Sequence, residues 1–194
     1  LEEQGVTVRI EDYIVTPYSK ERVQQVLDTF KPDVVGGTGV TMNINRSLAI
    51  LKDYRDYAPD IVTVMGGPHV TFDATAILQD NSWIDYVVRG EGELTFMELL
   101  ENLHLPSKLE HVKGISYRRN GRVHHNQRRA FIEDINILPF PARHLVELSK
   151  YRALGFPVNL MTSRGCPFSC IFCVGSKMVG RRVRYFDVKR VVDE

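Results

Sequence analysis

Short apolar runs that end in glycine recur within residues 1–105, and they restrict the possible folds more than any other feature of the chain. The runs "KPDVVGG", "DIVTVMGG" and "DYVVRGEGE" each have the composition of a buried strand that leads into a glycine loop. Apolar residues at helical spacing alternate with these runs. They are Val23, Val26, Leu27 and Phe30; Ile44, Leu48 and Leu51; and Phe96, Leu99, Leu100 and Leu103. This repetition predicts an α/β fold, a Rossmann-like parallel sheet with helices on both faces.

Strand-like segments also flank these repeats. Residues 6–15 (VTVRIEDYIV) are rich in β-branched side chains and alternate in part, so we expect a strand there, with Ser19 as the N-cap of the helix that follows. Residues 114–126 (GISYRRNGRVHHN) read as a hairpin, because Asn120-Gly121 supplies the positive φ angles of a type I′ turn.

The pattern changes again after the hairpin. Residues 137–143 (ILPFPAR) are proline-rich and read as a linker, and residues 156–166 (FPVNLMTSRGC) read as a fresh strand. We therefore predict three regions: a Rossmann-like domain over 1–110, a hairpin and linker over 111–150, and the start of a second domain over 151–194. The chain begins at Leu1 and ends within an apparent helix, so we expect it to be a piece of a longer protein.

The carboxyl ends of parallel strands are where such sheets bind ligands, and here three of those ends carry glycine loops. Glycine allows a close backbone approach to a ligand, and the helix start that follows favours anions. We predict ligand contacts from Gly36, Gly37, Thr38, Gly39, Val40, Thr41, Gly66, Gly67, Pro68, His69, Gly90, Glu91 and Gly92. The competing interpretation is that the loops are only tight strand-to-helix turns. None of them has the G-x-G-x-x-G pattern of a dinucleotide site.

Several charged side chains admit two interpretations. Glu91 and Glu93 could act as an acid–base pair, but stabilising the start of the next helix is the favoured role. His124 and His125 on the hairpin most simply form a solvated face. Three arginines near the end of the chain could contact an anionic ligand or be surface charge: Arg181, Arg182 and Arg184.

All three cysteines of the chain, Cys166, Cys170 and Cys173, lie in one stretch with C-x3-C-x2-C spacing. An odd, clustered set is a poor disulfide framework and indicates a reducing compartment, so we expect a cytoplasmic protein. A loop of this spacing suits three corners of a [4Fe–4S] cluster and leaves the fourth iron open to a substrate or cofactor. Zinc with His144 as a further ligand, or inert cysteines, are the alternatives.

The composition excludes two classes of partner. A net charge of +1 gives no basic face for nucleic acid. No apolar run approaches the roughly 18 residues that span a bilayer.

The cysteine stretch "RGCPFSCIFC" resembles the signature loop of radical S-adenosylmethionine (radical SAM) enzymes, in which an aromatic residue precedes the third cysteine. The resemblance implies that Cys166, Cys170 and Cys173 hold the cluster, that S-adenosylmethionine chelates the open iron, and that Phe172 lies beside its adenine. One-electron reduction then cleaves the cofactor to a 5′-deoxyadenosyl radical. The resemblance also implies an external one-electron donor, such as flavodoxin or ferredoxin, and a small-molecule substrate.

The rest of the chain resembles the cobalamin-binding branch of that superfamily. Five segments are similar to that branch in their residues and in their order: "VMGGPHVTF", "DYVVRGEGELTFMELL", "GISYRRNGR", "LPFPAR" and "VGRRVRYFDVKRVVDE". The resemblance implies a cobalamin-binding Rossmann-like domain, followed by the first strand and cluster loop of a truncated (β/α) barrel. The D-x-H-x-x-G signature is absent, so His69 is not assigned as a cobalt ligand. The implied reaction is methyl transfer to an unactivated centre, and radical ring formation or rearrangement is the alternative reaction. Two other classes of function also stay open for the fragment: a cobalamin-binding module, or a plain iron–sulfur protein.

Overall fold

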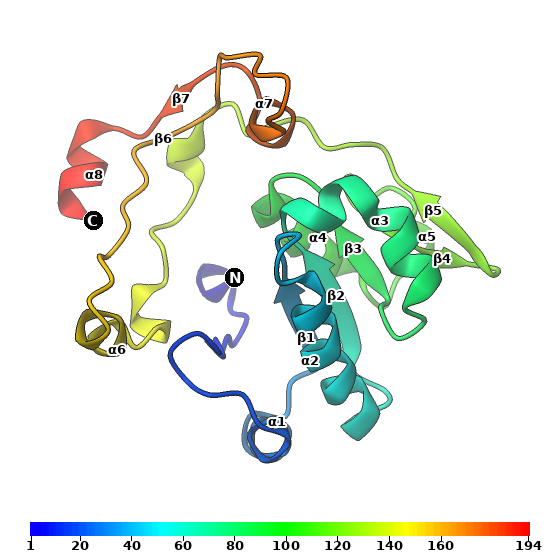
Figure 1. Cartoon of the computed structure of the whole chain (residues 1–194). Coiled ribbons are helices and arrows are strands. Elements are labelled where there is room, and N and C mark those ends of the chain that lie inside the picture. Colours follow the sequence, from blue (N-terminus) through cyan, green and yellow to red (C-terminus); the bar gives the residue numbers. More distant parts are fainter. The chain divides into compact units, whose positions relative to one another are not determined.

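The computed structural model describes residues 1–194, which divide into two compact units. One unit is Lys20–Phe131, and the other combines Leu1–Ser19 with Ile132–Glu194. Figure 1 shows the whole chain and its elements. No helix is both long enough and apolar enough to cross a membrane.

A five-stranded sheet in the order β1-β2-β3-β4-β5 forms the centre of the unit Lys20–Phe131. Its strands are β1 (Val34–Thr38), β2 (Val62–Gly66), β3 (Tyr86–Val88), β4 (Ile115–Arg119) and β5 (Arg122–His125). The first three are parallel, with Val34 opposite Val62 and Val64 opposite Tyr86. β4 and β5 then extend the sheet in the antiparallel sense.

The helices of this unit cover both faces of the sheet, which confirms the predicted α/β architecture. They are α1 (Lys20–Phe30), α2 (Ile44–Tyr57), α3 (Pro68–Asp80), α4 (Gly92–Asn102) and α5 (Pro106–Leu109). Neighbouring residues of one strand point to opposite faces, so Met65 and Val87 pack with α2 and α3, whereas Val64 and Val88 pack with Leu99 of α4. Two apolar cores therefore enclose the sheet.

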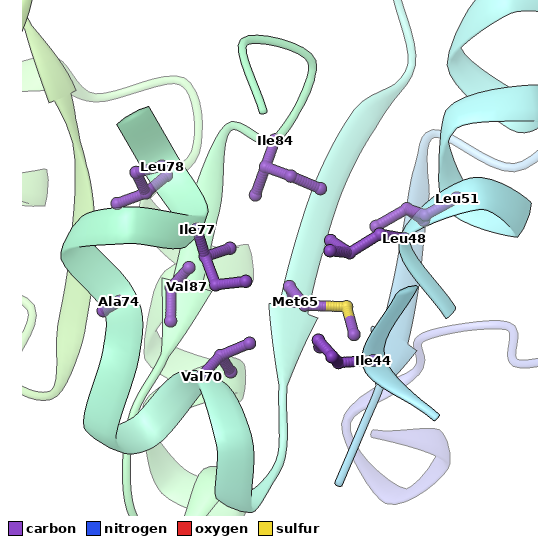
Figure 2. Packing of buried hydrophobic residues seen from close by; sticks show 10 residues of the cluster. All are labelled: Ile44, Leu48, Leu51, Met65, Val70, Ala74, Ile77, Leu78, Ile84 and Val87. Atoms are coloured by element: carbon purple, nitrogen blue, oxygen red, sulfur yellow. The ribbon is translucent and has the colours of Figure 1, made fainter. Parts of the chain in front are cut away.

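The core on the α2 and α3 side lies around Met65, which is fully buried. Figure 2 shows Ile44 and Leu48 of α2 on one side of Met65, and Val70 and Ile77 of α3 on the other. Full burial of an aliphatic side chain of this size contributes about 1.5–3 kcal/mol to folding. Ile44, Leu48 and Leu51 are all buried, so their helical spacing in the sequence correctly predicted the packing face of α2.

The hairpin prediction is confirmed, and the structure adds where the hairpin lies. Asn120 and Gly121 have φ angles of 50° and 72°, as a type I′ turn requires. β4 pairs with β3 through Tyr117 opposite Tyr86, so the hairpin continues the sheet.

The other unit contains short elements. They are the 3-10 turns η1 (Glu2–Gln4), η2 (Ile135–Ile137) and η3 (Arg143–Leu145), the helices α6 (Leu148–Ala153), α7 (Gly175–Val179) and α8 (Val188–Asp193), and the strands β6 (Ser163–Arg164) and β7 (Arg184–Tyr185). β6 and β7 pair in the antiparallel sense.

Two strand predictions in this unit are wrong. Residues 6–15 form no strand, and within 156–166 only Ser163–Arg164 is a strand. A strand requires a neighbour that completes its hydrogen bonds, and these segments have no such neighbour in the chain. A β-branched composition favours the strand conformation but does not supply that neighbour.

Candidate functional site

The parallel strands bring the three predicted loops to one edge of the sheet. β1 ends at Thr38, β2 at Gly66 and β3 at Val88, and each is followed by a loop and a helix start. Because the three strands run in the same direction, these loops share the carboxyl edge. The structure thus places the thirteen predicted residues from Gly36 to Gly92 at or beside this edge.

Hydrogen bonds connect the loops after β1 and β2. The amide of Gly39 donates to the carbonyl of Gly66 at 3.2 Å, and the amide of His69 donates to the carbonyl of Gly39 at 3.2 Å. The His69 ring contacts the Thr41 hydroxyl through Nδ1 at 3.1 Å. The first loop also turns on itself, because Val40 N donates to Asn43 Oδ1 at 2.8 Å. The two loops therefore form one connected surface.

Thr71 connects the loop after β2 to the loop after β3. Its hydroxyl donates to the carbonyl of Gly67 at 2.9 Å and accepts from the amide of Gly90 at 3.0 Å. No motif in the sequence indicates this role for Thr71. A threonine one turn into a helix has no distinctive pattern, so only the fold identifies its role.

The glycines of the edge divide into two kinds. A Cβ added to Gly67 would lie 2.6 Å from Thr38 Oγ1, and one added to Gly39 would lie 2.8 Å from Ile44 Cδ1. Gly67 is required for the two loops to pack against each other, because its Cβ would also lie 2.9 Å from the carbonyl oxygen of Gly39, whereas the neighbour of Gly39 is the end of a flexible side chain. A Cβ on Gly66 would meet only the carbonyls of Gly37 and Val88, at 3.9 and 4.0 Å, and one on Gly90 would meet nothing within 4 Å. A Cβ would therefore have ordinary contacts at Gly66 and would enter open space at Gly90.

Exposed apolar side chains occur in the loop after β1 and in α3. Met42, in the loop after β1, is 97% exposed. Val40 in the same loop and Phe72 in α3 are also exposed. Apolar surface beside free backbone is typical of a site for a large, partly apolar ligand.

The charged residues of the third loop have mainly structural contacts. Glu91 occupies the N-cap position of α4 without a capping hydrogen bond from its side chain, and Glu93 lies in the first turn. Arg89 donates to the carbonyls of Ile115 and Asn126 at 3.0 and 2.5 Å. Burial, and then the charge of Arg128, lower the pKa of Arg89. Arg89 therefore connects the third loop to the hairpin.

The three cysteines lie in the other unit, in the loop between β6 and β7. None forms a disulfide; Cys170 and Cys173 are exposed, and Cys166 is half-buried. The amide of Gly175, at the start of α7, donates to Cys173 Sγ at 3.2 Å. Phe172 is 90% exposed, and Phe168 and Ile171 are exposed as well. The thiols are thus free and accessible.

The structure does not gather three or more His, Cys, Asp or Glu side chains into a metal-binding group. His144, the further ligand in the zinc alternative, belongs to no such group, and its Nε2 lies 3.1 Å from Glu2 Oε1. The predicted ligation by Cys166, Cys170 and Cys173 stays a prediction.

The sheet and its glycine-lined edge define a Rossmann-like ligand-binding domain. A family model described as the B12 binding domain matches residues 1–100. An uncharacterized methyltransferase of Pyrococcus horikoshii is 38% identical over 188 residues, which are 96% of this chain and 41% of that protein. An anaerobic magnesium-protoporphyrin IX monomethyl ester cyclase of Rubrivivax gelatinosus is 35% identical over 192 residues, with 94% of this chain and 34% of that protein covered.

A solved structure is similar over nearly the whole chain. It is the cobalamin-dependent S-adenosylmethionine radical enzyme OxsB with aqua-cobalamin and S-adenosylmethionine bound, at a TM-score of 0.82 and 25% identity, covering 99% of this chain and 26% of that one. The chain therefore belongs to the B12-binding-domain family, in the branch that accompanies radical SAM enzymes. It spans less than half the length of each of these three proteins.

Proposed function

We propose that this chain provides the cobalamin-binding domain and the cluster-binding loop of a radical SAM enzyme that transfers a methyl group to an unactivated carbon or phosphorus centre. The observation that carries the proposal is that one chain joins a B12-binding-family domain to a C-x3-C-x2-C loop with free thiols. The relative from Pyrococcus horikoshii, a methyltransferase by name, supports methyl transfer as the reaction type.

Cobalamin would bind at the carboxyl edge of β1, β2 and β3. The edge would suit a large ring system, because Gly66 and Gly90 cover the backbone there with no side chain, and Met42 in the loop after β1 and Phe72 in α3 are exposed apolar side chains. Backbone amides and carbonyls in the three loops would hold the polar periphery of the ligand. Contacts would come from Gly36, Gly37, Thr38, Gly39, Val40, Thr41, Gly66, Gly67, Pro68, His69, Gly90, Glu91 and Gly92.

The [4Fe–4S] cluster would be held by Cys166, Cys170 and Cys173, and Phe172 would lie against the adenine of S-adenosylmethionine. Thiolates are the ligands that such clusters require, and the exposed thiols of this loop fit that requirement. When bound, the cluster supplies an electron to S-adenosylmethionine and cobalamin supplies a carrier for the methyl group. The amide of Gly175 beside Cys173 Sγ would stabilise the negative charge of the thiolate.

The partners in this proposal are a small-molecule substrate and an external one-electron donor such as flavodoxin or ferredoxin. A radical cyclisation is the second candidate reaction, because the Rubrivivax gelatinosus relative is a cyclase of comparable identity. A module that binds cobalamin without catalysis is the alternative from another class.

Anaerobic reconstitution tests the proposal. The chain should take up about four irons with sulfide, and its cluster spectrum should change when S-adenosylmethionine is added. The Cys170→Ser variant should lose most of the iron, whereas Ser169→Ala, a change at an exposed position of the same loop, should retain it. A cluster that ignores S-adenosylmethionine would contradict the enzyme proposal, and failure to bind aqua-cobalamin would contradict the cobalamin assignment.

A further inference from the structure

The cysteine loop is closed at its base by a neck, defined here as β6, β7 and the hydrogen bonds beside them. Ser163 pairs with Tyr185 and Arg164 with Arg184. The amide of Phe186 donates to the carbonyl of Thr162 at 3.0 Å on one side of this ladder. On the other side, the amide of Cys166 donates to the carbonyl of Gly180 at 2.9 Å. All three cysteines lie in the loop that the neck closes, between Arg164 and Arg184 in the sequence.

Arg184 is buried in the neck although it is charged, with 7% of its surface exposed. Its Nη1 donates to the carbonyl of Ile132 at 2.5 Å, and its Nη2 donates to the carbonyl of Val179 at 2.7 Å. Ile132 begins a small apolar core with Ile135 and Leu138, and Val179 is the last residue of α7. One guanidinium thus joins the neck to the end of the cysteine loop and to a packed segment outside it.

Gly165 shows how closely the two sides of the neck approach each other. Its φ angle is +120°, and a Cβ at this position would lie 2.2 Å from the carbonyl oxygen of Arg182. No other residue fits there without a shift of backbone. The neck therefore has a defined geometry, in which the backbone leading into Cys166 lies directly against the backbone that leaves the loop.

We propose that Arg184 is a positioning residue for the cluster loop, which it serves by holding the neck closed; this inference rests on the proposed binding of a cluster by Cys166, Cys170 and Cys173. An open loop must lose conformational entropy before three thiolates can meet one cluster, and a closed neck removes part of that cost in advance. A buried guanidinium with two carbonyl acceptors is suited to this role, because each charged hydrogen bond is stronger than a neutral one.

The test compares three variants of the chain by two measurements. Amide hydrogen exchange without metal reports the neck through the amides of Cys166 and Phe186, and iron content after anaerobic reconstitution reports the cluster. Arg184→Met should speed exchange at both amides by about tenfold and lower bound iron well below the wild-type amount. Arg184→Lys, which keeps the charge but offers fewer directed donors, should have intermediate effects. Arg182→Met removes an exposed arginine from the same segment and should change neither measurement.

The outcomes separate this inference from the proposed function. Unchanged exchange in Arg184→Met would overturn the closing role of Arg184, whatever the wild type binds. Faster exchange with undiminished iron would overturn the importance of the neck for the cluster. A wild-type chain that binds no iron would overturn the proposed function and with it the positioning role, while the exchange data would still decide whether Arg184 closes the neck.

Discussion

At the scale of single residues, Gly67 has a backbone conformation that other residues avoid. Its φ and ψ angles are 98° and 177°, and a Cβ there would lie 2.6 Å from Thr38 Oγ1 and 2.9 Å from the Gly39 carbonyl oxygen. Gly67→Ala should therefore combine backbone strain with a clash between two loops, and should lower the free energy of unfolding by about 2–4 kcal/mol. Urea denaturation followed by circular dichroism measures this loss.

Gly121→Ala is the matched control, because Gly121 also has a positive φ angle, 72°, but nothing lies within 4 Å of an added Cβ. It should cost only the backbone term, about 1–2 kcal/mol. Equal losses in the two variants would show that the crowding between the loops does not matter for stability.

Two comparisons of single residues show what could not be predicted from the sequence. The paired glycines at the end of β2 predicted a special loop, yet an added Cβ would have only ordinary contacts at Gly66 and would clash at Gly67, although the two are adjacent and identical in type. Among the arginines after the cysteine loop, Arg181 and Arg182 are exposed, whereas Arg184 is buried on two carbonyls. In each comparison the residues are of the same type. The contacts that distinguish them include ones with segments distant in sequence, which the residue type alone does not predict.

At the scale of elements, helices followed from the sequence more directly than strands. The backbone of α2 forms its hydrogen bonds within the helix and needs no partner segment. The spacing of Ile44, Leu48 and Leu51 was therefore sufficient to predict its buried face. Residues 6–15 and most of 156–166 have strand-like composition but no paired neighbour, and strand composition cannot supply one. The three parallel strands were predictable because each continuous apolar run was linked to a helix.

The hairpin β4–β5 gives a prediction at this scale, through His125. The His125 ring contacts Ser116 Oγ of β4 at 2.8 Å and Thr75 Oγ1 of α3 at 3.0 Å. Burial, and then the charges of Arg89 and His124, lower the pKa of His125 below its ordinary value of 6.5. The unfolded chain then binds a proton more readily than the folded one, so the stability contributed by neutral His125 is present above the ordinary pKa and decreases as the pH falls toward the lower folded value.

Urea midpoints at about pH 7.5 and about pH 5.5 test this sign. The wild type should lose stability between the two values, and His125→Gln should lose less over the same interval. His104→Gln changes an exposed histidine in the turn that follows α4, and this variant should behave as the wild type. A wild type that gains stability toward the lower pH, with His125→Gln showing no such gain, would reverse the assigned direction.

At the scale of the whole molecule, the two proposed cofactors belong to different compact units. The glycine loops lie within Lys20–Phe131, and the cysteines lie within the unit that contains Ile132–Glu194. Each unit has its own core: Met65 and Val87 belong to the first, and Ile132, Ile135 and Leu138 to the second. We therefore expect that binding of one cofactor does not require the residues that hold the other, even though the proposed reaction requires both.

This separation predicts opposite defects in two variants of the chain. Gly66→Leu adds a side chain at the last residue of β2, where a Cβ meets only ordinary contacts at 3.9 and 4.0 Å, so we expect the fold to tolerate it while bound cobalamin is obstructed. Its affinity for aqua-cobalamin, measured by absorbance titration, should fall at least about tenfold, with iron uptake and the urea midpoint near wild type. Cys170→Ser should show the reverse, with little iron and normal cobalamin affinity. If either variant lost both cofactors while keeping its wild-type urea midpoint, the two sites would be coupled and the assignment of one cofactor to each unit would be wrong.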